Sequence, residues 1–152
     1  LIQKKKKHTK KKNKKTLPQK KSLLHAAPLI RNPKIRVLHG EPSYVCQNKE
    51  GQIHETESIS AGLDYPGVSP IHCFLKDTKR ARYTYATDED ALNAHVMVTK
   101  YENLNPSLEP SHAFAEAIKI APKLSKDTII IVNSCGDAKK DRDILRERLG
   151  KR

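Results

Sequence analysis

A continuous run of β-branched apolar residues, TIIIVN at positions 128–133, constrains the fold of this chain more than any other feature. Apolar side chains on both faces of a strand require cover on both faces, as in a parallel sheet packed between helices. A turn at 134–136 follows directly, and loops at the carboxyl ends of parallel strands are where such sheets usually bind ligands. The run therefore predicts an α/β fold with a candidate site at residues 134–138.

Helical patterns flank this run on both sides. Thr87 is placed to cap a helix over 88–101, with Asp90 as its reciprocal partner in a capping box. A second helix is expected over 109–121, and a charged helix over 138–149. The apolar stripe of the second helix has helical spacing and consists of Ala113, Phe114, Ala117, Ile118 and Ala121.

Extended patterns dominate the part of the chain that precedes these helices. Strand-like runs at 35–38 and 44–47, with a polar glycine turn at 48–51, predict a hairpin. Residues 61–70 contain two glycines and two prolines and are expected to form a loop. Residues 82–86 favour a further strand.

The positive charge of the chain is concentrated at its start. Residues 1–21 contain eleven lysines and no acid, and without them the net charge of +13 falls to about +2. A run of like charges with few apolar side chains predicts a disordered tail, which leaves residues 22–152 as the folded part. An alternative is a nuclear-import or polyanion-binding segment, which would bind nucleic acid weakly and with strong salt dependence.

The three cysteines, Cys46, Cys73 and Cys135, are odd in number and widely spaced. This usage argues against a disulfide framework and for a reducing compartment such as the cytoplasm. The histidines lie in no zinc-ligand spacing, and no apolar run approaches the roughly 20 residues that a membrane span needs.

Several motifs resemble, in the same order, those of one enzyme family. The segment SISAGLDYPGV at 58–68 closely resembles S-x-S-A-G-L-D-Y-P-x-V of tryptophan synthase beta subunits. The similarity extends over about residues 25–149. The other matching segments are HAAPL at 25–29, VLHG at 37–40, QIHET at 52–56, TDEDAL at 87–92, PSLEPSHA at 106–113 and NSCGDAKKD at 133–141.

The resemblance implies a fold, a cofactor and a reaction. The fold is the C-terminal part of a two-domain type II pyridoxal-phosphate architecture, with helices on a mostly parallel sheet. The reaction condenses indole with L-serine to give L-tryptophan, and the cofactor serves as its electron sink. The implied partners are an alpha subunit or domain and a second beta chain.

Three residues are implied to contact the cofactor. Glu109 matches the glutamate beside the cofactor ring, although on its own it could be a carboxylate favoured by a helix N-terminus. Cys135 matches a serine that hydrogen-bonds the pyridine nitrogen, and Gly136 the glycine after it. A thiol is a poorer hydrogen-bond partner than a hydroxyl, so this contact would weaken. A catalytic pair of Cys135 with His112 is conceivable, but nothing in the sequence sets its geometry.

Three further positions are implied to have other roles. Asp64 matches an aspartate that pairs with an arginine when the site closes, although an aspartate in such a place is often only a turn residue. The carbonyl oxygens of Tyr65 and Gly67 match those that coordinate a monovalent cation, and carbonyls suit such hard ions.

Departures from the family pattern lower the expectation of activity. Asp137 replaces an arginine, Ala138 replaces a glycine whose backbone could need a positive φ, and Lys139 replaces an aspartate. The H-K-x-N segment with the Schiff-base lysine and the phosphate-binding G-G-G-S-N segment do not occur in this sequence. We therefore assign no catalytic residue and expect a truncated chain that is inactive alone. The alternative is a non-catalytic binding or regulatory protein that competes at the beta-subunit interface.

Overall fold

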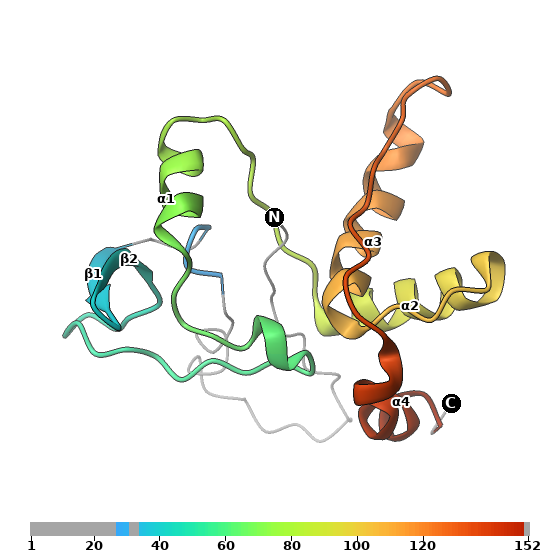
Figure 1. The fold of residues 1–152 in the computed structure, drawn as a ribbon, viewed down its shortest axis with the longest axis horizontal. Coiled ribbons are helices and arrows are strands. Elements are labelled where there is room, and N and C mark those ends of the chain that lie inside the picture. The colour runs from blue at the N-terminus through green and yellow to red at the C-terminus, as the bar shows by residue number, and fades with distance from the viewer. Residues whose placement is uncertain (1–26, 31–33, 151–152) are drawn as a thin grey trace, which may run out of the picture.

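The computed structural model describes residues 27–30 and 34–150 of the chain (Figure 1). The lysine-rich segment 1–21 lies outside the described residues, and so do the predictions of disorder and polyanion binding that concern it. No helix among the described residues is long and apolar enough to cross a membrane.

The predicted hairpin is present, although its main turn lies earlier than expected. Strand β1 (Lys34–Leu38) pairs antiparallel with β2 (Glu41–Val45). The two-residue loop has φ of 53° at His39 and 84° at Gly40, and positive φ at both positions is the geometry that matches the twist of a hairpin. The expected glycine turn follows, closed by an isolated bridge between Gln47 and Ile53.

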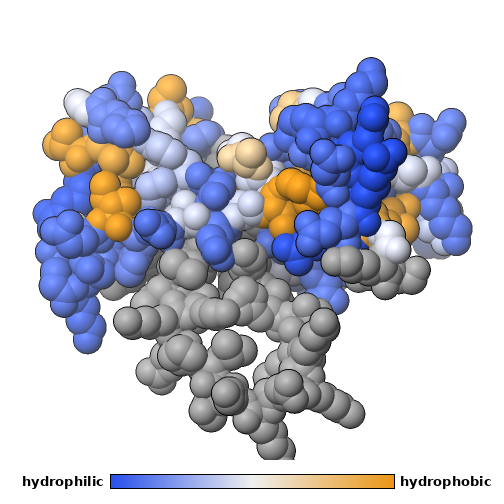
Figure 2. All heavy atoms as spheres, turned by 90° about the horizontal axis from the view of Figure 1, so that it is seen from below, coloured by the Kyte–Doolittle hydropathy of each residue, from blue (hydrophilic) through white to orange (hydrophobic). Residues whose placement is uncertain are grey.

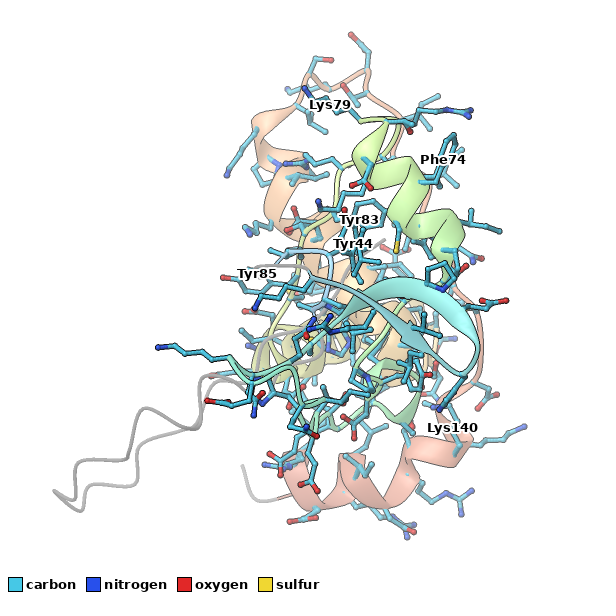
Figure 3. All side chains as sticks on the ribbon, turned by 90° about the vertical axis from the view of Figure 1, so that its left-hand side faces the viewer. Tyr44, Phe74, Lys79, Tyr83, Tyr85 and Lys140 are labelled. Atoms are coloured by element: carbon cyan, nitrogen blue, oxygen red, sulfur yellow. The ribbon has the colours of Figure 1, made fainter. Side chains whose placement is uncertain are left out.

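Helix α1 (Pro70–Asp77) was not predicted, because its first residue, Pro70, ends a stretch rich in glycine and proline. Proline is tolerated in a first helical turn, and the Ser69 hydroxyl accepts a hydrogen bond from Ile71 N at 3.3 Å. The helix packs on β2, where the Tyr44 hydroxyl donates to the Asp77 carboxylate at 2.9 Å. Figure 3 shows Tyr44 and Tyr83 near this helix, while Phe74 points outward and is 57% exposed.

The two central helices form where the sequence predicts them. Helix α2 (Asp88–Glu102) begins with the complete capping box between Thr87 and Asp90. Helix α3 (Leu108–Ile120) packs against α2 and ends in the 3₁₀ turn η3 (Ala121–Lys123), which contains Pro122. The buried face of α3 is more polar than predicted. It carries Leu108, Ser111, His112 and Glu116, whereas Ile118 of the expected stripe is 38% exposed.

A small apolar core joins α2, α3 and the C-terminal part of the described chain, which lie together on the right-hand side of Figure 1. Ile59, Leu92 and Leu108 form its buried part. The 3₁₀ turn η4 (Ala138–Asp141) and helix α4 (Arg142–Leu149) complete it, and they confirm the helix expected over 138–149. Ile144, Leu145 and Leu149 of α4 pack on this core.

The predicted parallel sheet does not form within the described residues. Their one sheet is the antiparallel pair β1 and β2. Residues 128–133 are extended but unpaired, with Ile129 86% and Ile131 90% exposed, and 82–86 form no strand either. A strand needs neighbours to complete its backbone hydrogen bonds, and the described residues offer none beside 128–133. Residues 27–30 and 34–150 thus contain the expected mixture of helices and strands, without the expected parallel sheet.

Candidate functional site

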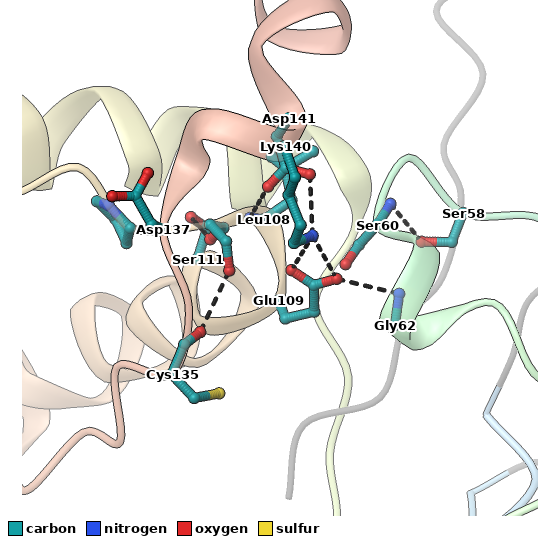
Figure 4. A network of polar contacts seen from close by, with 12 residues as sticks. Ser58, Ser60, Gly62, Leu108, Glu109, Ser111, Cys135, Asp137, Lys140 and Asp141 are labelled. Carbon is teal, nitrogen blue, oxygen red and sulfur yellow. Dashed lines mark hydrogen bonds and ion pairs between the residues drawn. The ribbon is translucent and has the colours of Figure 1, made fainter.

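Three segments meet at the N-terminus of α3 (Figure 4). They are residues 58–64, the first turn of α3, and residues 134–141. The loop 134–138 was predicted as a site, and it lies against the first turn of α3. An isolated bridge joins Pro106 to Asp137, and Ala138 N donates to Asn105 O at 3.3 Å.

The first turn of α3 is capped from a distant part of the chain. Ser107 occupies the N-cap position, yet its hydroxyl donates to the carbonyl of Cys135 at 3.2 Å and caps no N–H of the helix. The carboxylate of Asp141 instead accepts from Leu108 N at 2.8 Å. Asp141 is only 3% exposed, so its charge interacts with the helix N-terminus with little screening by water. The serine thus fixes the 134–136 loop, and the aspartate satisfies the helix.

Glu109 forms the centre of the polar network. Its carboxylate accepts from Gly62 N at 3.0 Å and from Lys140 Nζ at 2.8 Å to each oxygen. Lys140 Nζ also donates to Asp141 at 3.0 Å. Partial burial alone would raise the pKa of Glu109. The hydrogen bonds from Lys140, from its own backbone N–H and from Gly62 outweigh burial and lower this pKa to about 2.

Lys140 is charged for the complementary reason. Desolvation would lower the pKa of its ammonium, but hydrogen bonds to Glu109 and Asp141 raise it above the ordinary lysine value. Both members of the pair are therefore ionised at neutral pH. The site presents a carboxylate that is held in place and nearly neutralised, rather than a free general base.

Two glycines allow this close packing. A Cβ on Gly62 would lie 2.8 Å from Glu109 Oε1, so a side chain there would displace the carboxylate. Gly136 has a φ of 92°, and a Cβ on it would lie 3.0 Å from Ser107 Oγ. The glycine that the sequence analysis selected at 136 thus permits both the backbone turn and the contact of the loop with α3.

Cys135 lies beside this network. Its thiol is exposed, and Figure 4 shows the sulfur directed away from the carbonyl that binds Ser107. The suggested pair with His112 finds no support. That histidine is fully buried, with Nδ1 2.6 Å from Leu108 O and Nε2 3.9 Å from Asp88.

The departures from the family pattern have local structural roles. Asp137 accepts from Lys139 N at 2.7 Å and so caps η4. Ala138 has no positive φ, and it is 3% exposed within η4. The expectation that alanine would strain the backbone at this position is therefore wrong, because a 3₁₀ turn has ordinary negative φ.

Of the remaining predicted residues, Tyr65 and Gly67 lie beside the hairpin. The Tyr65 hydroxyl is 2.9 Å from His39 Nδ1. Gly67 is buried, and a Cβ on it would lie 2.7 Å from Leu38 Cδ2. A cavity of about 160 Å³ is lined by Tyr65, His39 and Ser43 among others. The exposed Asp64 follows the 3₁₀ turn η2 (Ala61–Leu63), whose Gly62 binds Glu109.

Sequence reasoning missed Ser107, Lys140 and Asp141. All three stand in the segments that resemble the family, at 106–113 and 133–141. Serine is a common N-cap residue, so Ser107 before α3 gave no reason to look for a second capping group such as Asp141. A lysine–aspartate pair at the start of a charged helix reads as solvated surface.

Comparisons with known proteins give the chain its family. No family model matches it. The tryptophan synthase beta chain of Bordetella petrii is 52% identical to it over 126 residues, and that of Bordetella parapertussis is 51% identical over the same length. This chain is a homologue of the tryptophan synthase beta chain. The match covers 83% of the chain and 31% of each relative, and it corresponds to the C-terminal part of the beta chain.

Proposed function

We propose that residues 25–149 supply the cofactor-ring side of a tryptophan synthase beta active site. In the complete assembly, this site would condense indole with L-serine. The assembly would include an alpha subunit and a second beta chain. The observation that carries the proposal is the meeting of Glu109, Cys135 and Gly136 at one helix N-terminus, in a chain half identical to beta chains over 126 residues.

The residues present fit one side of pyridoxal phosphate. The Cys135 thiol is exposed and is a weak hydrogen-bonding group, which suits a ring nitrogen that carries no proton. The Ser60 hydroxyl is fully buried and has no hydrogen-bond partner within the described part of the chain. It belongs to the segment that binds Glu109 through Gly62. A polar group at this place would satisfy it.

Each residue of this site then has a definite task. Pyridoxal phosphate, when bound, supplies the electron sink for the reaction. Glu109 would lie beside the ring as a fixed carboxylate, because Lys140 and Gly62 prevent it from rotating. Lys140 would offset its charge, so that the ring does not face an unpaired anion. Gly136 would let the backbone approach, and Cys135 would orient the ring through its nitrogen.

The chain alone is expected to be inactive. It contains neither the H-K-x-N segment nor the G-G-G-S-N segment that the family uses for the Schiff base and the phosphate. Incubation of the chain with pyridoxal phosphate, followed by borohydride reduction and peptide mass analysis, should find no specific lysine adduct. A stoichiometric adduct on one lysine would contradict this expectation.

A covalent chimaera tests the proposed function directly. Residues 25–149 would replace the matching part of the Bordetella petrii beta chain, and tryptophan formation from indole and L-serine would be measured. We expect turnover, and a loss of about 100-fold with Glu109→Ala, the order of loss that follows when a group that positions the reactants is removed. Glu102→Ala, at the exposed end of α2, serves as the control and should leave turnover unchanged. A chimaera that folds and retains the cofactor but forms no tryptophan would overturn the proposal.

A further inference from the structure

A cavity of about 330 Å³ lies between α2 and the second half of α3, which pack together on the right-hand side of Figure 1. Small-molecule sites occupy about 300–1,000 Å³, so this volume is at the lower end of their range. Small side chains leave the space, since Ala86, Ala94 and Ala115 all line the cavity. None of its described lining residues belongs to the network of Glu109, which lies in the first turn of α3.

The wall of the cavity contains a buried carboxylate that lacks a hydrogen bond. Glu116 is 8% exposed, and its Oε2 accepts no hydrogen bond from the residues that the structure describes. Two cations approach this carboxylate loosely. Lys119 Nζ lies 3.4 Å from Oε2, and Arg82 Nη2 lies 4.0 Å from Oε1. Hydrogen-bonded pairs of this kind are usually about 2.7–2.9 Å long, so Glu116 keeps an acceptor that a better placed donor would satisfy.

The charged groups on the wall favour a positively charged ligand. Asp90 adds a second carboxylate, although its Oδ2 already accepts from Thr87 N at 2.9 Å. Lys119 supplies the one ammonium among the lining residues that the structure describes. Its side chain is 62% exposed, so it can leave Glu116 with little loss of packing. An anion would instead face both carboxylates and would lose its hydration without gaining a partner.

Apolar side chains form much of the remaining wall. Met97 of α2 and Ile118 of α3 are 42% and 38% exposed, and Tyr85, which precedes α2, is 38% exposed. The hydrocarbon part of a ligand would remove this surface from water, and the gain would follow the apolar area that is covered. The arrangement therefore fits a small molecule with an apolar body and a single cationic group.

We infer that this cavity binds a small organic amine. The ammonium of the amine takes the place of Lys119 on Glu116, and its apolar body packs on Met97 and Ile118. An ammonium has three N–H donors, so it can bond Oε2 while another N–H still faces water. The inference goes beyond the proposed function and does not depend on it, because the two sites share no residue.

Titration of the full chain with 2-phenylethylamine, followed by ¹⁵N NMR, tests the site. We expect the backbone amides of 93–97 and 115–119 to shift, with a Kd on the order of 1 mM for a ligand of this size. The control ligand is 2-phenylethanol, which has the same apolar body and no charge. It should bind at least about tenfold more weakly, because it cannot form a charged hydrogen bond with Glu116. Equal binding of the alcohol, or no shift of these amides with the amine, would overturn the inference.

Two substitutions at the carboxylate should change the affinity in opposite directions. Glu116→Gln keeps the size of the side chain and removes its charge, so the Kd of the amine should rise at least about tenfold. Lys119→Met removes the competing ammonium, and the Kd should fall by about two- to fivefold, the value of an exposed ion pair. Glu102→Gln is the matched control at an exposed glutamate of α2, and it should leave the Kd unchanged.

Ala115→Leu separates the cavity from the carboxylate. Leucine forms helices nearly as well as alanine, and its larger side chain would fill space that the amine needs while Glu116 stays in place. This variant should lose binding of 2-phenylethylamine, and the same NMR spectra show that each variant is folded. An unchanged Kd in Glu116→Gln or in Ala115→Leu would contradict the inference, and so would weaker binding by Lys119→Met.

Discussion

Glu109 shows how a few hydrogen bonds decide the state of a single residue. Its surroundings are partly desolvated, which would favour the neutral acid, yet the donors around it keep it ionised with a pKa of about 2. Lys140 contributes the only ammonium among these donors. The half-exposed lysine side chain is screened by water, which limits the stabilisation that the pair can provide.

Lys140→Met should change how stability depends on pH. A carboxyl whose pKa is depressed in the folded state stabilises that state above its unfolded pKa of about 4.5, and this contribution is lost as pH falls from there towards 2. Urea unfolding at a series of pH values should show a shallower loss in this window for Lys140→Met. At pH 7 we expect it to be less stable by about 1 kcal/mol.

Lys139→Met is the matched control for this measurement. Lys139 is adjacent, its side chain is 81% exposed, and its ammonium lies 3.8 Å from Asp137. The Lys139→Met substitution should change the free energy of unfolding by less than about 0.5 kcal/mol. It should leave the loss of stability at acid pH unchanged. If the unchanged chain and both variants lose stability identically at acid pH, Lys140 does not set the ionisation of Glu109.

Gly136→Ala should destabilise the chain more than Gly40→Ala. Both glycines have a positive φ, so each substitution carries a backbone cost of roughly 1–2 kcal/mol. Only at Gly136 would the added Cβ also press on Ser107, at 3.0 Å, whereas nothing lies within 4 Å of a Cβ at Gly40. Thermal unfolding of the two variants separates the backbone cost from the cost of the contact with Ser107. Equal losses of stability would argue against that contact.

At the scale of the elements, the sequence predicts the features that depend on neighbouring residues. The structure confirms two predictions: the capping box of Thr87 and Asp90, and the end of α3 near Pro122. Each depends on residues that lie within one or two helical turns of each other. The prediction of a strand at 128–133 was wrong. Strand pairing depends on other chain segments, and a local sequence pattern contains no information on them. The cap of α3 by Asp141 is separated from it by 33 residues and gave no local signal.

Asp141→Ala should therefore destabilise α3 although it lies outside that helix. It removes a buried acceptor from Leu108 N and one partner of Lys140. Loss of such a charged hydrogen bond is expected to cost about 2–3 kcal/mol. Asp143→Ala, in the exposed first turn of α4, should cost less than about 1 kcal/mol, as for a surface charge near a helix N-terminus. Similar losses in urea unfolding for the two variants would refute the capping role.

At the scale of the whole molecule, the residues that the structure describes bury few large side chains for their number. Its apolar core contains Ile59, Leu92 and Leu108, with three residues of α4 packed against it. Large apolar side chains remain exposed on the hairpin, on α1 and along 129–131. Figure 2 shows such side chains gathered at separate places on an otherwise polar face. The resemblance selected Glu109 and Cys135, which lie near the N-terminus of α3 in the structure. No residue pattern could reveal how much surface would stay uncovered.

The exposed isoleucines should limit solubility rather than stability. Ile129→Lys combined with Ile131→Lys removes apolar surface at positions 86% and 90% exposed, so the substitutions disturb little packing. Charges on an open strand edge also oppose pairing between copies. Sedimentation velocity at increasing concentration should show less self-association for this double variant, while its urea midpoint stays unchanged because the two side chains make few contacts in the monomer. A fall in the midpoint equivalent to more than about 1 kcal/mol would mean that the segment already packs within the isolated chain.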